Sequence, residues 1–318
     1  MSTKEGNILV HSFNENFIYG LKLQDTGIDI KSEIKFTEKN RSGLLTLDDF
    51  IVQKDKAIEE NNRTILTKVE NIPLVKRQEA KSQIHLGNIA IDFTNPIPRG
   101  TFNTFLVENT NLIKRSNIYR NLIRMNPDCH FVFLSPVIDH TNRFAGMIKE
   151  EDANNRSSIF KLKRENKAEL FLLTKILPHY LNHLRNSGKN VVLIVEDIEV
   201  LYMELYGLFR NNSSDEVYQF IREIQTLCCN TKEGSLSTIC FKGAASNVDI
   251  QFQKMIDNFD TELTLLSASV IDSSDKDSKR TAKNAISGFN FRYSRTKAFS
   301  PLQSYLSLKL YDLLLKVF

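Results

Sequence analysis

The sequence predicts an α/β protein in which a mostly parallel sheet is covered by helices and follows a small N-terminal β domain. From about residue 86, short apolar runs alternate with segments of helical periodicity, as in strand–helix–strand units. The run NVVLIVED at 190–197 is almost continuously apolar, as in a strand buried on both faces of a parallel sheet. Residues 5–70 instead hold short alternating segments separated by Asn, Gly and Asp, which favours a small β domain.

Three parts are expected along the chain: a barrel-like β domain at 1–75, the α/β domain at 76–300 and a short C-terminal helix at 301–318. Leucines at helical spacing in the last segment indicate a helix packed on the core or on a partner. The polar segments 150–158 and 272–283 are expected to be loops. In the α/β domain the expected strands are 104–107, 130–135, 190–197, 237–243, 261–267 and 289–294, and the expected helices are 117–125, 142–151, 165–186 and 215–230.

Composition and charge limit the functional classes. A net charge of +4 is too small for a nucleic-acid footprint, so no nucleic-acid partner is expected. The four cysteines lack CxxC spacing and two are adjacent, so we expect reduced core thiols and no metal site. The N-terminus has neither a signal peptide nor a presequence, and no apolar run approaches the roughly 18 residues of a membrane span. We expect a cytoplasmic protein that reaches the inner face of a membrane only within a complex.

The segment after strand 104–107 has the frame of a phosphate-binding loop without its chemistry. Such loops need glycines so that backbone N–H groups turn onto phosphate oxygens, and a lysine follows. Here the turn is Glu108-Asn109-Thr110-Asn111, which has no glycine, and Ile113 stands in the lysine position. Lys114 would point about 100° further round a helix of 3.6 residues per turn. The sequence therefore predicts a degenerate site, in which Lys114 or Arg115 is the only substitute cation.

The end of strand 190–197 carries a second element of nucleotide-binding sites. Glu196 and Asp197 follow a buried apolar run, where a Walker-B-type carboxylate binds Mg²⁺ through water. The alternative interpretation is a pair of acidic residues at the solvent edge of a strand.

A family resemblance joins these features. The segment GNIAIDFTNPIPRG, 87–100, is similar to the one preceding the phosphate loop in α subunits of F1-type rotary ATPases, which has a Gly-x-x-Ala-x-Asp…Pro-Ile-x-Arg-Gly pattern. The segment from Phe171 to Gly207 resembles the family's helix, Ser-Gly-Lys turn and acidic strand end, with Tyr202 and Tyr206 near its Ala-Tyr-Arg region. The matching positions in the first segment are Gly87, Ala90, Asp92, Pro96, Ile97, Arg99 and Gly100.

Two later segments extend the resemblance in the same order. GSLSTICFKGAASNVD, 234–249, resembles the family's Gly-Ser-Leu-Thr strand, and FRYSRTKAFSPLQ, 291–303, resembles its Ser-x-Ser-Arg segment. Together the similar segments cover about residues 85–305. The resemblance implies a RecA-like fold and a C-terminal helical domain reduced to 301–318.

The departures from the family pattern define the expected function. The resemblance places Asp139 near the glutamate that orients water in catalytic β-type subunits, and Arg295 where α-type subunits present an arginine to the neighbour's γ-phosphate. Such an arginine is worth roughly 10³–10⁵ in rate. The alternative for Arg295 is a surface arginine in a basic segment. With the phosphate loop degenerate, we expect a pseudo-ATPase that turns over no substrate and needs no cofactor.

The leading hypothesis is a non-catalytic structural subunit beside a catalytic F1 β-like subunit in a hetero-oligomeric assembly. One alternative is a divergent ATPase that uses Lys114 or Arg115 with Glu196 and Asp139 and binds ATP or ADP with Mg²⁺. Another is a Rho-like RecA-type nucleic-acid binder, although the first 70 residues hold no concentrated basic stripe. A free-standing interaction protein that reuses the fold is the fourth.

Overall fold

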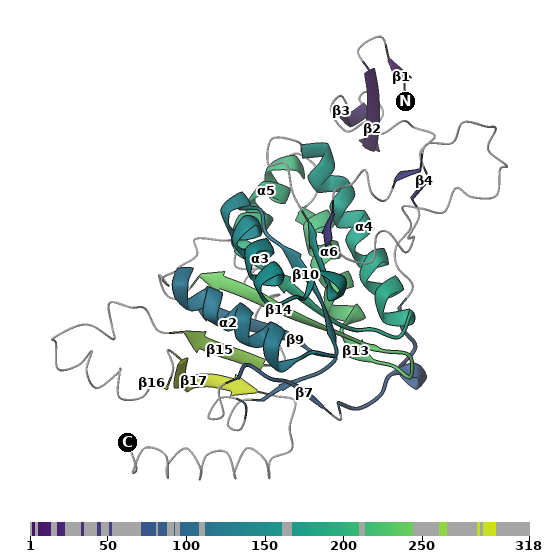
Figure 1. Ribbon diagram of the computed structural model, residues 1–318. Coiled ribbons are helices and arrows are strands. Elements are labelled where there is room, and N and C mark those ends of the chain that lie inside the picture. The colour runs from purple at the N-terminus through teal and green to yellow at the C-terminus, as the bar shows by residue number, and fades with distance from the viewer. Residues whose placement is uncertain are drawn as a thin grey trace.

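The computed structural model gives an α/β fold (Figure 1). The residues that it describes are 2–3, 6–13, 18–22, 33–34, 43–45, 51–52, 71–80, 82–87, 92, 96–107, 112–160, 167–209, 214–243, 261–265, 285–286 and 289–296. Side chains are described for 71–80, 82–87, 92, 96–105, 116–160, 170, 173–205 and 217–242.

The centre of the molecule is a mostly parallel sheet, as the sequence predicts. The strand order is β16-β17-β15-β9-β14-β12-β10-β11-β5, and β13 pairs with β14. Pairing is parallel from β15 to β5 and antiparallel at β17, β16 and β13. The strands are β5 (Gly43–Leu45), β9 (Phe102–Val107), β10 (Cys129–Leu134), β11 (Ser157–Phe160), β12 (Asn190–Val195), β13 (Cys229–Asn230), β14 (Ser235–Gly243), β15 (Thr261–Leu265), β16 (Ala285–Ile286) and β17 (Phe289–Thr296).

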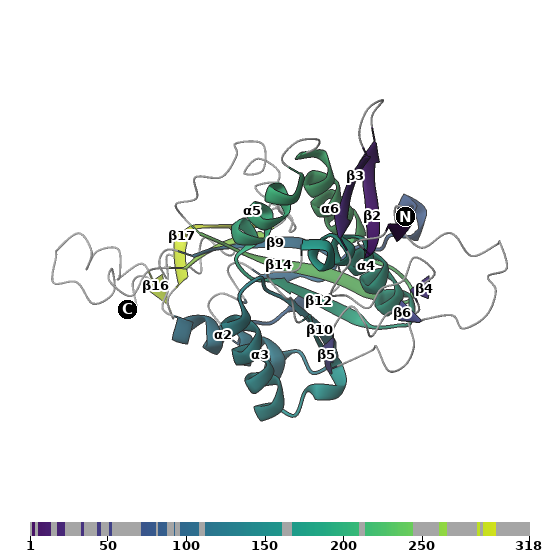
Figure 2. The ribbon, with the colours of Figure 1, turned by 90° about the horizontal axis from the view of Figure 1, so that it is seen from above.

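Helices cover both faces of this sheet. Figure 2 shows α2 and α3 on one side, and α4, α5 and α6 on the other. The two sides follow from right-handed crossovers, because the chain moves from β9 to β10 and β11 and then reverses through β12 to β14. The helices are η3 (Leu74–Lys76), α2 (Leu112–Met125), α3 (Ile138–Glu150), η4 (Asn154–Arg156), α4 (Lys167–Asn186), α5 (Ile198–Phe209) and α6 (Ser214–Leu227).

Each face of the sheet packs its own apolar core. Under α2 and α3, the rings of Phe133 and Phe144 stack with centroids 4.1 Å apart, and Tyr119 meets both rings edge-on. Under α4, α5 and α6 the core is mainly aliphatic, with an apolar cavity of about 20 Å³ between the sheet and α5 and α6. A cavity of that size with no polar lining has room for one water but nothing to bind it.

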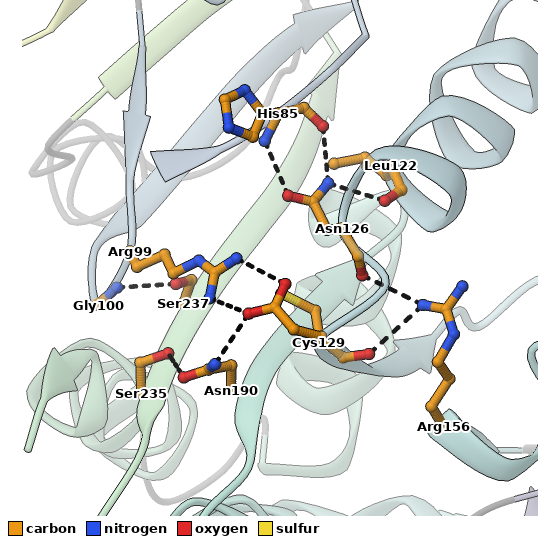
Figure 3. Close-up of polar contacts among 11 residues, drawn as sticks. His85, Arg99, Gly100, Leu122, Asn126, Cys129, Arg156, Asn190, Ser235 and Ser237 are labelled. Atoms are coloured by element: carbon orange, nitrogen blue, oxygen red, sulfur yellow. Dashed lines mark hydrogen bonds and ion pairs between the residues drawn. The ribbon is translucent and has the colours of Figure 1, made fainter. Parts of the chain in front are cut away.

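A polar network ties the strands together at their amino ends (Figure 3). Asp128 lies just before β10. Its carboxylate accepts hydrogen bonds from both terminal guanidinium nitrogens of Arg99 and from the side-chain amide nitrogen of Asn190. Asn190 opens β12 and accepts a hydrogen bond from Ser235 Oγ at the start of β14, with 3.0 Å between the two oxygens. Because Arg99 hydrogen-bonds the carboxylate, the pKa of Asp128 is lowered. The network crosses the sheet from β9 to β10.

The segment 87–100, which resembles a family motif, forms part of this amino edge. Asp92 Oδ1 accepts the Leu86 N–H at 2.7 Å, and Asp92 Oδ2 accepts the Gly87 N–H at 3.1 Å. Gly87 and Gly100 both have positive φ, at 72° and 80°, which glycine adopts without strain. The motif residues described here therefore shape the backbone that enters β9.

The segment 150–158 is not the polar loop expected from sequence. It contains the end of α3, the short helix η4 and the start of β11. Arg156 organises it, because its guanidinium donates to the Ile123 carbonyl oxygen at 2.8 Å. It also donates to the Asn126 carbonyl oxygen at 3.2 Å (Figure 3). Arg156 thus provides hydrogen-bond donors for backbone carbonyl oxygens at the C-terminal end of α2.

The six expected strands are observed as β9, β10, β12, β14, β15 and β17, and the expected helix 165–186 is observed as α4. The expected helix 215–230 is observed as α6 but ends at Leu227, and Cys229 and Asn230 form β13. All four cysteines are free and buried, and burial raises the pKa of the Cys129 thiol to about 12. Within the described residues, every helix is too short or too polar to serve as a membrane-spanning segment.

Short strands outside the central sheet pair antiparallel: β1 (Ser2–Thr3) with β2 (Gly6–Phe13), β2 with β3 (Ile18–Lys22), β4 (Glu33–Ile34) with β6 (Ile51–Val52), and β7 (Gln83–Ile84) with β8 (Ile97–Pro98). The β domain at 1–75 stays a prediction, because only short backbone pieces of it are described. The expected loop 272–283 and the expected helix 301–318 lie outside the described residues.

Candidate functional site

The candidate site lies where β10 and β12 end side by side. These strands are parallel neighbours, and Leu134 pairs with Val195 in register, so both stop at the same level. After β12 come Glu196 and Asp197, and after β10 the chain turns into α3, whose first turn carries His140. In open α/β sheets, ligands bind outside the carboxyl ends of the strands.

The backbone holds Glu196 and Asp197 firmly. The Glu196 N–H donates to the Leu134 carbonyl oxygen at 2.9 Å, which continues the β10–β12 pairing by one residue. The Asp197 carbonyl oxygen accepts hydrogen bonds from the N–H groups of Val200 and Leu201, so Asp197 caps the start of α5, which begins at Ile198. Its φ of 48° lies in the left-handed region, which is uncommon for a residue other than glycine. The sharp turn from strand to helix therefore occurs at the acidic pair.

An imidazole completes the group. His140 Nδ1 lies 2.9 Å from Asp197 Oδ2, and the two side chains are only 14% and 22% exposed. Glu196 is 1% exposed. One donor atom from each of His140, Glu196 and Asp197 lies within 4.8 Å of the other two. Two carboxylates and an imidazole so close together can hold a cation or share a proton.

The residues predicted from sequence fall into two groups. Glu196 and Asp197 lie together at the end of β12, and Asp139 lies in the first turn of α3, exposed and next to His140 in the chain. The remaining residues are not brought into this group by any described contact. Lys114 and Arg115 lie in α2 with undescribed side chains, Arg295 lies in β17 opposite Glu262 of β15, and Asn109 and Asn111 lie outside the described residues.

Sequence reasoning missed two residues at this edge. His140 follows Asp139 directly, and only the adjacency of β10 and β12 shows that it meets Asp197. Lys242 lies near the end of β14, two residues after Cys240, which pairs with Val195. It is only 9% exposed, which is rare for lysine. The available signal was a lysine placed between the apolar run of 239–241 and a glycine.

Comparison of the chain with known protein families gives no match, and comparison with curated proteins also gives none.

Proposed function

We propose that the chain is a non-catalytic, RecA-like subunit similar to F1 α subunits, and that it packs beside a catalytic β-like subunit in a cytoplasmic or membrane-peripheral assembly. The observation that carries the proposal is the order of the central strands. Among the parallel strands β9, β10, β11, β12, β14 and β15, numbered one to six along the chain, the spatial order is 6-1-5-4-2-3.

This strand order favours a RecA-like fold over two other folds that bind nucleotides. It differs from the 3-2-1-4-5-6 order of dinucleotide-binding domains and from the 2-1-3-4-5 order of flavodoxin-like domains. Here β14 lies between β9 and β12, and Glu196 and Asp197 follow β12. The frame of the site is therefore compatible with the sequence resemblance.

The proposal of a non-catalytic subunit rests on the turn after β9. Residues 108–111 contain no glycine, and Glu108 would repel a phosphate. We expect the purified chain to show no binding of Mg-ATP or Mg-ADP by calorimetry at millimolar nucleotide. Micromolar binding would overturn this part of the proposal and favour the divergent ATPase. In that case Lys114→Ala should abolish binding, while Lys149→Ala, a change of an exposed lysine in α3, should not.

The assembly itself is the second part of the proposal. A tagged copy of the chain should co-purify with a defined partner that has a complete phosphate loop, and the complex should hydrolyse ATP. Purification of the chain alone, or of a complex without a phosphate-loop subunit, would reject this part.

Arg295 is proposed to act on the partner's nucleotide. Arg295→Ala in the purified complex is expected to lower kcat by roughly 10³-fold, because the arginine would stabilise charge on the transferring phosphate. Steady-state ATPase measurements check this, with Arg292→Ala in the same strand as the matched control. Equal activity of the Arg295→Ala complex and the native complex would leave Arg295 a surface residue.

A further inference from the structure

We propose that His140, Glu196 and Asp197 form a binding site for a divalent transition-metal ion of the Zn²⁺ class. The site is independent of the proposed assembly, because all three ligands belong to this chain. It differs from a magnesium site that uses carboxylates alone, because a histidine from the neighbouring strand–helix junction is part of it.

The spacing of the donor atoms suits one small ion. With metal–ligand bonds of about 2.0–2.1 Å, neighbouring ligands of a four- or six-coordinate ion lie about 3.0–3.4 Å apart. His140 Nδ1 and Asp197 Oδ2 are 2.9 Å apart, and the largest separation within the three donors is below 4.8 Å. A metal ion would lie among these three donor atoms and bind all of them.

The surroundings also favour a bound cation. Glu196 is 1% exposed, and a buried carboxylate is stabilised by a nearby positive charge. The backbone fixes two of the ligands before binding, since Glu196 continues the strand pairing and Asp197 caps the start of α5. His140 lies in the first turn of α3, and Glu150 at the end of this helix and the next residue, Glu151, form ion pairs with Arg120 and Arg124 of α2. The three ligands therefore come from rigid elements, which lowers the entropy lost on binding.

The donor set selects the class of metal. Imidazole nitrogen suits Zn²⁺, Fe²⁺ and Ni²⁺, whereas Mg²⁺ prefers oxygen ligands and retains its waters. Three protein ligands leave at least one position for water, as in open zinc sites. The ion would join the β10–α3 junction to the β12–α5 junction and would present a Lewis-acidic face at the carboxyl edge of the sheet.

Calorimetry with ZnCl₂ alone, on the full chain after treatment with EDTA, tests the proposal without nucleotide or partner. We expect one Zn²⁺ per chain with micromolar affinity, and a thermal midpoint that rises with Zn²⁺ concentration. His140→Gln should weaken binding by at least about 10-fold, since loss of even a supporting residue commonly has that effect. Asp197→Asn should do the same, and asparagine tolerates the positive φ at this position, so the backbone is kept.

His85→Gln is the matched control. His85 also lies beside a carboxylate, with 3.9 Å between its Nδ1 and Asp92 Oδ2, but it belongs to no three-ligand group among the described residues. Its Zn²⁺ affinity should equal that of the native chain. Three results would overturn the proposal: no Zn²⁺ binding by the native chain, unchanged binding by His140→Gln, or Mg²⁺ binding equal to Zn²⁺ binding. A thiolate charge-transfer band with Co²⁺ would assign the metal to cysteines and would also reject it.

Discussion

Replacing Gly100 by alanine is expected to lower the free energy of unfolding by about 3 kcal/mol or more. Gly100 has a φ of 80°, which strains any residue with a side chain. A Cβ atom at this position would lie 2.7 Å from the backbone nitrogen of Asn230 and 2.7 Å from the carbonyl carbon of Cys229. Both contacts are with backbone, so no side-chain rotation relieves them. The shift would also disturb the Gly100 N–H bond to Ser237 Oγ, 2.8 Å long, shown in Figure 3.

Gly146→Ala provides the control for this prediction. Gly146 lies in α3, and a Cβ atom there would meet no atom within 4 Å. Alanine should stabilise this helix position by about 0.5–1 kcal/mol. Urea unfolding followed by circular dichroism measures both variants against the native chain. Equal stability of the Gly100→Ala variant and the native chain would contradict the close contact between β13 and residue 100.

Lowering the pH from 7 to 5 is expected to remove about 2 kcal/mol of stability through His130 alone. His130 lies in β10 and is 3% exposed. Its Nδ1 is 3.2 Å from Lys189 Nζ, and its Nε2 is 2.8 Å from Ser158 Oγ, which lies 2.7 Å from the Tyr180 hydroxyl. The lysine ammonium can only donate, so Nδ1 accepts and Nε2 carries the proton. No position remains for a second proton on this ring without breaking the contact with Lys189.

The direction of the effect follows from the pKa of His130. Burial, and then the positive charges of Lys189 and Arg156, lower this pKa from 6.5 to about 3. In the unfolded chain the imidazole binds a proton below pH 6.5, whereas in the folded chain it stays neutral. Stability that is complete above pH 6.5 therefore falls as the pH drops from 6.5 towards 3, by up to about 1.4 kcal/mol for each pH unit.

His130→Gln isolates this contribution. The variant should be less stable than the native chain at pH 7, because its amide fits the buried network less well, but its stability should change less between pH 7 and pH 5. His85→Gln, which changes an exposed histidine outside this buried network, is measured alongside it for comparison. Urea unfolding at pH 5, 6 and 7 measures these slopes. If the free energy of unfolding changed equally with pH in His130→Gln and in the native chain, the burial of a neutral His130 ring would be contradicted.

The sequence predicts the buried strands well because their signal is local. In β10 and β12 nearly every residue is apolar, and both strands are buried along almost their whole length. Helix α5 is not predicted, because its sequence IEVLYMELYGLF is apolar on most sides and lacks a clear polar face. Strand β11 is missed for a different reason: its four residues, SSIF, begin with two serines that are buried by packing from elsewhere in the chain.

The candidate site is predicted only in part, for a reason of topology. Glu196 and Asp197 are recognised because an apolar strand immediately precedes them. The contact of Asp197 with His140 depends on β10 and β12 being neighbours, although β11 and α4 lie between them in the chain. Periodicity carries no information on strand order. A histidine at position 140 therefore has no local feature that distinguishes it from a surface residue.

The polar network at the amino ends of the strands has an evolutionary consequence. Arg99, Asp128, Asn190 and Ser235 join four neighbouring strands at the edge opposite to Glu196 and Asp197. Selection for a foldable chain acts on that edge, whereas selection for ligand chemistry acts on the other. The chemistry of the carboxyl edge can then change while the scaffold persists. Substitutions accumulated in a lineage of such chains would concentrate in the turn after β9 and spare Arg99 and Gly100.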